Sequence, residues 1–584
     1  MVRNLGRLGF VLAALSLNAL ASSAGAASPA SPVQRTTSLG VVIGNDDSAS
    51  TGTYSWKGLP YAKPPVAGLR WKAPAEAEPW TTPRPTQQFG AACASSGRVY
   101  GPGFNNRYDA TIAASVDKTV GSEDCLYLNI WSPATKAAQD QKLPVIVFVH
   151  GGSNITGYTA DPVYDGAMLA KTANAVVVTV NYRLGVLGFF KSPALKTGDP
   201  LDDSGNFALL DIIKSLQFIN RNIGSFGGDA GNVTLMGESA GAVNVYALMT
   251  SPLLVKAEPA LVHRLLPMSG GISRAEDLPA GAFPVLVDAS LFEIQANLLL
   301  SELLIADGLA ADATAAKAYI AAHKPDELSS YLRGKSADAV LSMVITKLKA
   351  AGISSSNPVP DGHVLPKSPI AAIKAGQYLK VPVLAGNTHD EGKLFPSLLA
   401  LSPLLGGISG RLPSDAEAFT IAMSYDPDAA PKAKLEDWIP AAYLPTDKPG
   451  TGFNAHMEVL NAYWFKPLRD NVLNALKTQQ AKVWYYSFDW AQEPAPFNEI
   501  FGAAHANDLP FAFGNFGPSL WANFMFSKAN QPGRLALSDA MMRSIGAFAL
   551  SGNPNHPSLG VNWPAWPKTL IFDATPKAKA IRVP

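Results

Sequence analysis

The middle of the chain alternates runs that are almost entirely apolar with a helical pattern. Residues 145–149 and 176–180 are continuous runs rich in valine, and 233–236 supply a third. Such runs are typical of strands buried on both faces of a parallel sheet. Apolar residues recur at helical spacing over 208–222, between the second and third runs. The alternation predicts an α/β protein with a mostly parallel central sheet flanked by helices.

The pattern changes on both sides of this region. Short segments at 41–43 and 53–56 predict an N-terminal β-rich segment. Residues 251–360 are rich in alanine and leucine, and they predict a helical insertion packed over the end of the sheet where chemistry takes place. Beyond the insertion we expect two strands and a helix, at 381–385, 481–486 and 537–550.

Composition and charge narrow the class of protein. The 584 residues are 47% hydrophobic, which is enough for one large buried core. The net charge is +1, from 47 basic and 46 acidic residues, so the charge gives no indication of nucleic acid or an anionic membrane as a partner. We therefore expect a single domain over 38–584.

The N-terminus has the pattern of an export signal. Arg3 and Arg7 precede an apolar run at 8–20, and small residues follow it. This order is typical of a signal peptide, and the apolar run is short for a membrane anchor. We expect residues 1–26 to be removed and 27–37 to form a connector. The mature chain, without an integral membrane span, is then periplasmic or extracellular.

The two cysteines, Cys93 and Cys125, are consistent with an exported protein. An oxidising compartment favours one local disulfide over two buried thiols. In the chain-entropy model, a bond that closes a loop of this length stabilises the folded state by about 3–4 kcal/mol.

Ser239 is the strongest candidate for chemistry. It is the centre of the sequence GESAG (237–241), after a predicted buried strand and before a helical stretch at 240–249. This context holds a serine on a strained turn with its hydroxyl exposed, and the two glycines avoid clashes of a Cβ atom with neighbouring backbone. To act as a nucleophile, the hydroxyl needs a histidine to take its proton and a carboxylate to orient that histidine.

Two long segments carry a family resemblance. They read SEDCLYLNIWSP (122–133) and FGGDAGNVTLMGESAGA (226–242). Both closely resemble the signature segments of the type-B carboxylesterase family, which includes cholinesterases and bacterial para-nitrobenzyl-type esterases. The resemblance covers most of the mature chain. It implies an α/β-hydrolase fold and hydrolysis of small-molecule carboxylic esters through an acyl-enzyme, with no metal or other cofactor.

The remaining catalytic residues are implied by the resemblance. His505, at the head of HANDLPFAFGN, matches the family's catalytic histidine. His389 lies two residues from Glu391 in one loop, which argues against it as the base, and His150 is expected to shape its own loop. Glu391 matches the family's acid, although the residues alone do not separate it from Asp390. The order serine, glutamate, histidine is the one expected of this fold.

The resemblance also implies the oxyanion hole. Gly152, Ser153 and Ala240 match the residues that supply its N–H groups, and Gly151 permits the tight backbone. Relatives usually carry three glycines followed by an aromatic residue, whereas here Ser153 and Asn154 follow two glycines. We expect these two side chains to reshape the wall of the active site.

Several further positions match supporting residues of the family. Glu238 and Ser269 match residues that line or buttress the site, and Cys93 and Cys125 match the family's disulfide. Two structural ion pairs are implied, Arg70 with Glu123 and Arg183 with Asp229.

The substrate is less visible in the sequence. The disulfide loop has no tryptophan of the kind that stacks on choline in cholinesterases, which disfavours choline esters. A general carboxylic esterase is the leading interpretation. The alternatives are a serine amidase or carbamate hydrolase on the same fold, and a non-catalytic scaffold relative. The filled triad positions argue against the scaffold.

Overall fold

The computed structural model describes residues 32–135, 141–353, 355–401 and 410–584, so the predicted export signal lies outside the described residues. Its centre is a ten-stranded sheet in the order β15-β14-β13-β12-β11-β9-β10-β8-β4-β3. Strands β9 to β15 pair in parallel, and β8, β4 and β3 extend the sheet in antiparallel pairs. The predicted mostly parallel α/β sheet is confirmed.

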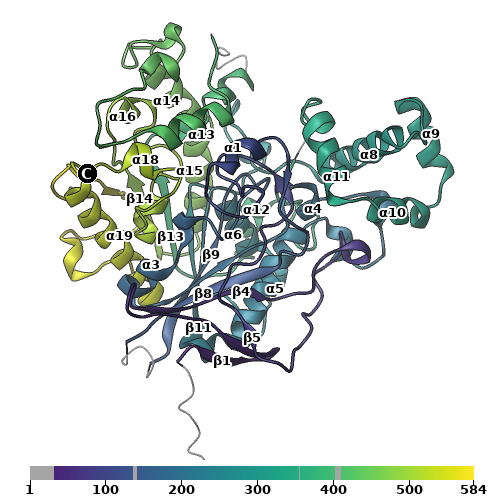
Figure 1. Ribbon diagram of the computed structural model, residues 1–584, viewed down its shortest axis with the longest axis horizontal. Coiled ribbons are helices and arrows are strands. Elements are labelled where there is room, and N and C mark those ends of the chain that lie inside the picture. The colour runs from purple at the N-terminus through teal and green to yellow at the C-terminus, as the bar shows by residue number, and fades with distance from the viewer. Residues whose placement is uncertain (1–31, 136–140, 354, 402–409) are drawn as a thin grey trace, which may run out of the picture.

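The strands of the sheet have the following bounds: β3 Asn45–Asp47, β4 Thr53–Pro60, β8 Tyr127–Pro133, β9 Leu143–Val149, β10 Val176–Val180, β11 Gly228–Glu238, β12 Arg264–Met268, β13 Val383–Thr388, β14 Val483–Phe488 and β15 Leu570–Phe572. Helices cover both faces (Figure 1). One face packs against α5 (Phe207–Asn222), α6 (Ala240–Thr250), α12 (Pro369–Lys374) and α15 (Phe465–Lys477). The other packs against α3 (Ala167–Ala173), α17 (Leu509–Phe513) and α19 (Gln531–Ser551).

Strand β9 shows why the apolar runs become central strands. Val145, Val147 and Val149 pack on the side of α5 and α6, whereas Ile146 and Phe148 pack on the side of α19. All five are at most 1% exposed. Successive side chains of a strand point to opposite faces, so a strand covered on both faces needs an apolar residue at every position.

The expected helical insertion contains a strand of the central sheet. β12 lies between β11 and β13, so the prediction of a helical insertion from residue 251 is wrong at this point. The sequence of β12 includes Pro267, and a proline usually indicates an edge strand or no strand. The strand therefore has no clear signal of its own.

The helical part of the insertion forms a group on one side of the sheet (Figure 1), made of α8 (Ala289–Ala306), α9 (Ala313–Ala322), α10 (Pro325–Arg333) and α11 (Ala337–Met343). Among the described helices, α8 alone is long and apolar enough to cross a membrane by length and composition. Its Leu299 and Leu303 are buried in a cluster with Trp71 and Phe190, so one side of this helix packs inside the protein.

The N-terminal part differs from the prediction at the connector. Residues 34–37 form strand β1 (Gln34–Thr37), which pairs antiparallel with β2 (Gly40–Ile43), so the ordered domain begins before residue 38. The sequence of β1 is polar and lacks the alternation of a half-buried strand. The strand is therefore defined by tertiary contacts, chiefly its pairing with β2, and not by a pattern in its own sequence.

Two predicted links hold the N-terminal region. Cys93 and Cys125 form the expected disulfide, with their Cα atoms 4.9 Å apart. Arg70 and Glu123 form the expected ion pair through two hydrogen bonds of 2.6 Å. Arg70 also donates to the carbonyl of Lys335 at 2.5 Å, which connects this region to the helical insertion.

The second predicted ion pair is wrong. Arg183 pairs with Asp211 of α5, with Nε and Nη2 at 2.8 and 2.7 Å from the two carboxylate oxygens. Asp229 instead accepts the N–H of Gly231 in its own turn at 2.9 Å. Both aspartates precede Ser239 in the sequence, and the packing of α5 on the sheet decides which of them reaches Arg183.

Candidate active site

Ser239 occupies a sharp turn between β11 and α6. Its backbone angles are φ 56° and ψ −123°, a region that residues other than glycine rarely adopt. The N–H of Ser239 donates to the carbonyl of Met268 at the end of β12, at 2.8 Å. The neighbouring strand therefore holds the strained turn, which presents the hydroxyl to the cavities described below.

Close packing explains the glycines around this turn. A Cβ atom on Gly237 would lie 2.6 Å from the backbone of Gly241, and one on Gly241 would lie 2.1 Å from the carbonyl oxygen of Val149. A Cβ atom on Gly151 would lie 2.7 Å from the carboxylate of Glu238. The steric reason predicted for the glycines of GESAG is confirmed.

His505 and Glu391 form a buried pair. His505 Nδ1 hydrogen-bonds Oε2 of Glu391, and the two side chains are 4% and 2% exposed. The other carboxylate oxygen accepts Asn387 Nδ2 at 2.8 Å and the N–H of Thr388 at 3.1 Å. Burial opposes the charged carboxylate, but His505, Ser269 and Asn387 outweigh it and lower the pKa of Glu391.

Asp390 faces away from this pair. Its Oδ2 accepts a backbone N–H at 3.1 Å and lies 3.7 Å from Nζ of Lys393. The side chain of His389, 61% exposed, lies 3.2 Å from Asp390. Of the two carboxylates that the residues alone left open, Glu391 is therefore the one that contacts His505.

A second carboxylate approaches His505 from the other side. Oε1 of Glu238 lies 3.1 Å from Nε2 of His505, without hydrogen-bond geometry. Burial raises the pKa of Glu238 to about 8. Burial also disfavours the imidazolium, but Glu238 and Glu391 outweigh this effect and raise the pKa of His505 to about 9. The site thus stabilises the positive charge that His505 acquires when it takes a proton.

The loop after β9 brings free N–H groups to the same place. Gly152 and Ser153 have positive φ angles of 99° and 57°. Within the described part of the chain, the N–H groups of Gly152, Ser153 and Ala240 donate to no protein acceptor. Ala240 is the first residue of α6, so its N–H lies at the positive end of the helix.

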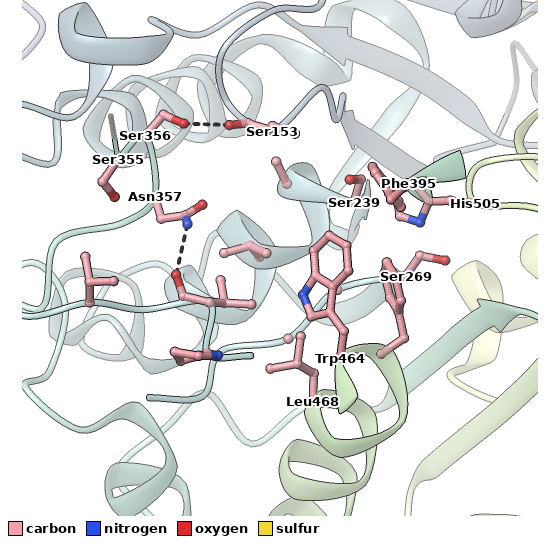
Figure 2. A pocket seen from close by; sticks show the side chains of 18 of the residues that line it. Ser153, Ser239, Ser269, Ser355, Ser356, Asn357, Phe395, Trp464, Leu468 and His505 are labelled. Atoms are coloured by element: carbon pink, nitrogen blue, oxygen red, sulfur yellow. Dashed lines mark hydrogen bonds between the residues drawn. The ribbon is translucent and has the colours of Figure 1, made fainter. Parts of the chain in front are cut away.

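Two cavities of unequal size meet at Ser239. The larger has a volume of about 440 Å³ and the smaller about 50 Å³, and Ser153, Phe395 and His505 line both. Figure 2 shows Ser239, His505 and Ser269 at one end of the larger cavity, with Ser355, Ser356 and Asn357 of the insertion at the other. The smaller cavity includes Tyr100, Asp161, Tyr164, Leu520 and Trp521.

Ser153 and Asn154, the two residues of the loop that differ from the family pattern, lie in different surroundings. Ser153 lines both cavities, as expected. Asn154 lines neither, and its side chain is fully buried, so the expectation that it reshapes the wall is wrong. With φ at 55°, the left-handed backbone of Asn154 turns the carboxamide into the protein interior.

The aromatic wall around the histidine was not predicted from the sequence. The rings of Phe395 and Phe465 lie 5.0 and 5.3 Å from the imidazole of His505. Trp464 packs on Phe465 at 4.4 Å and also lines the larger cavity. These residues come from segments without a motif, so only the folded chain brings them to the site.

Comparisons with known proteins match the chain over most of its length. The model of the Carboxylesterase family matches residues 31–282 and 295–579. The para-nitrobenzyl esterase of Bacillus subtilis (strain 168) is 30% identical over 548 residues, which cover 92% of this chain and 94% of that protein. The fumonisin B1 esterase of Sphingopyxis macrogoltabida is 31% identical over 534 residues, which cover 91% of this chain and 84% of that protein.

Solved structures show the same fold. A structure of PNB esterase superimposes with a TM-score of 0.68 at 27% identity, covering 94% of this chain and 97% of that one. A Geobacillus stearothermophilus carboxylesterase gives a TM-score of 0.67 at 26% identity, covering 94% and 98%. With its α/β-hydrolase fold and its match to the family over most of its length, this chain belongs to the carboxylesterase family and is a carboxylic ester hydrolase.

Proposed function

We propose that the chain cleaves carboxylic esters through two acyl transfers at Ser239. Oγ attacks the carbonyl carbon while His505 takes its proton, and the carbonyl π pair moves to oxygen. Collapse of this intermediate expels the alcohol, which receives the proton from His505. Water then attacks the acyl-enzyme in the same way, which releases the acid and restores Ser239. The observation that carries the proposal is the buried His505–Glu391 hydrogen bond beside Ser239.

The other roles follow from this mechanism. Glu391 keeps the proton of the neutral imidazole on Nδ1 and stabilises the imidazolium without taking up the proton itself. The N–H groups of Gly152, Ser153 and Ala240 stabilise the negative oxygen, and each such donor contributes about 3–4 kcal/mol to the transition state. Their freedom from other acceptors supports this role.

The unequal cavities predict a limit on ester size. p-Nitrophenyl acetate and methyl 4-phenylbutyrate each have one small group for the cavity of about 50 Å³, whereas p-nitrophenyl 4-phenylbutyrate has none. We expect kcat/KM for this last ester to be at least about tenfold below that for p-nitrophenyl acetate. Leu520→Ala, which enlarges the smaller cavity, should reduce this difference, and Leu291→Ala in the larger cavity should not.

Steady-state kinetics with these three esters test both the activity and the size limit. Equal kcat/KM for the two nitrophenyl esters would contradict the size limit. If the purified protein cleaved none of the three, the proposed function would be wrong.

Ser356 of the insertion supports the oxyanion loop. Its hydroxyl donates to the carbonyl of Ser153 at 2.7 Å. A neutral hydrogen bond contributes about 1 kcal/mol, so we expect Ser356→Ala to lower kcat for p-nitrophenyl acetate about fivefold. Ser355→Ala is the matched control, because Ser355 also lines the cavity but is held through its backbone by Gln295. Equal kcat values for the two variants would exclude this role of Ser356.

Export of the protein is part of the proposal. It is supported by the signal-like pattern of residues 1–26 and by the Cys93–Cys125 disulfide, which forms in oxidising compartments. Residues of the helical insertion line part of the larger cavity, and the size of this cavity supports small to medium esters as the substrate class.

A further inference from the structure

Three consecutive residues after β9 have a left-handed backbone. Gly152, Ser153 and Asn154 have φ angles of 99°, 57° and 55°. For a residue other than glycine this conformation costs about 1–2 kcal/mol, so it persists only where the surrounding structure holds it. Whatever holds this loop therefore also positions its N–H groups.

The carbonyl groups of the loop are all engaged. Every carbonyl from His150 to Asn154 accepts a hydrogen bond. The donors are Tyr182 Oη to His150 at 2.7 Å, His150 Nδ1 to Gly151 at 2.9 Å, the N–H groups of Ile155 and Thr156 to Gly152 at 3.0 and 3.1 Å, Ser356 Oγ to Ser153 at 2.7 Å, and the N–H of Gly185 to Asn154 at 2.6 Å. A peptide flip that turned an N–H group away from Ser239 would break at least one of these bonds.

The side chain of Asn154 adds a link of a different kind. Its Oδ1 accepts Nδ2 of Asn244 at 2.9 Å, and its Nδ2 lies 3.4 Å from Oδ1 of Asn244. The hydroxyl of Tyr182 lies 3.1 Å from the same Oδ1. Asn154 and Asn244 are both 0% exposed, so the two carboxamides pair with each other out of contact with water.

Asn244 lies on α6, the helix that begins directly after Ser239. The carboxamide pair therefore connects the loop that carries two of the proposed oxyanion donors to the helix whose first residue, Ala240, carries the third. We infer that the Asn154–Asn244 pair is a positioning element, which sets the loop N–H groups relative to Ala240 and Ser239. The inference rests on the proposed function.

The pair has an energetic signature that distinguishes it from two independent contacts. Removing one carboxamide leaves the other buried without its partner, which costs more than the hydrogen bond itself. Removing both avoids that penalty. The effects of the two single substitutions on the reaction should therefore not add in the double variant.

The test compares two inhibitors of the same length, a trifluoromethyl ketone and the corresponding methyl ketone. Oγ of Ser239 adds to the trifluoromethyl ketone, the carbonyl π pair moves to oxygen and His505 takes the proton, so this inhibitor needs the oxyanion hole. The methyl ketone binds with its carbonyl intact. Asn154→Gly, which retains access to the left-handed backbone, and Asn244→Ala are measured singly and together.

We expect each single variant to lower kcat about tenfold or more, with KM changed less than twofold. Affinity for the trifluoromethyl ketone should fall by a similar factor, and affinity for the methyl ketone should stay the same. The kcat of the double variant should be no lower than that of the less active single variant. The ketone ratio is the affinity for the trifluoromethyl ketone divided by the affinity for the methyl ketone. If Asn154→Gly does not fold, the ketone ratio of Asn244→Ala alone tests the inference.

Asn530→Ala is the matched control for stability. Asn530 is a buried asparagine at the start of α19 whose Nδ2 donates to the carbonyls of Gln492 and Met525, both at 2.8 Å. It should lower Tm without changing the ketone ratio. Loop variants that lower Tm in the same way but keep kcat and the ketone ratio overturn the inference. A wild-type protein that binds both ketones equally would overturn the oxyanion assignment and the inference with it.

Discussion

Replacing Ser239 with alanine is expected to lower kcat for p-nitrophenyl acetate by about 10⁵- to 10⁶-fold, with KM nearly unchanged. The methyl group cannot form the acyl-enzyme, so any remaining activity comes from water activated by His505 and from the oxyanion donors. The turn is held by the hydrogen bond from the N–H of Ser239 to β12 and not by the hydroxyl, so removal of the hydroxyl should not change the fold. Burst kinetics and steady-state rates on the purified protein measure the effect.

Ser251→Ala is the matched control for this variant. Ser251 is buried, follows the other end of α6, and has a hydroxyl with no hydrogen-bond partner among the described residues. A fluorophosphonate should label wild type and Ser251→Ala on the peptide that contains Ser239, and it should not label Ser239→Ala. Full activity in Ser239→Ala, or a label on another serine, would remove the basis of the mechanism.

The second large effect separates two adjacent carboxylates. Glu391→Gln is expected to lower kcat by about 10⁴-fold, because a carboxamide favours the wrong tautomer of His505 and no longer stabilises the imidazolium. Asp390→Asn should stay within about tenfold of wild type, since Asp390 contacts a backbone N–H and Lys393 rather than His505. Near-normal turnover in Glu391→Gln with a collapse in Asp390→Asn would reverse the assignment.

The pH profile gives Glu391→Gln a second readout. The general base must be neutral, so kcat/KM rises with pH as free His505 loses its proton. In the wild type the carboxylates raise the pKa of His505, which places this rise at higher pH than for an isolated imidazole. Loss of the Glu391 charge lowers that pKa, so the residual activity should rise at lower pH. If the rise of activity with pH occurred at the same pH in Glu391→Gln as in the wild type, the charges of Glu391 and His505 would not interact.

The sequence predictions that proved correct depend on local patterns. The runs at 145–149 and 176–180 became β9 and β10, because a strand covered on both faces needs a side chain that tolerates burial at every position. β12 was missed because Pro267 carries the opposite local signal, and its place is decided by pairing with β11 and β13. Polar β1 likewise forms through tertiary contacts, namely its pairing with β2 and the hydrogen bond from Ser225 Oγ to the carbonyl of Thr36.

Contacts between distant segments were decided by the tertiary structure. Glu391 and Asp390 are neighbours in the sequence, yet they point to different partners, and the one that meets His505 does so across 114 positions of chain. The pairing of Arg183 with Asp211 depends on how α5 packs on the sheet. The family resemblance identified the matching positions, but it did not indicate that Asn154 would turn inward to Asn244.

The sequence by itself determined strands β9 and β10, the strained turn at Ser239 and the need for glycine at 237. These features depend on side-chain periodicity and on clashes within a few residues, such as that of a Cβ atom at Gly237 with Gly241. Glycine at 241 is required by a tertiary contact, because a Cβ atom there would clash with Val149 of β9. The tertiary structure decided which carboxylate orients His505, how unequal the two cavities are, and what holds the oxyanion loop. Those outcomes depend on strand order, helix packing and the insertion, which bring together residues that no local pattern relates.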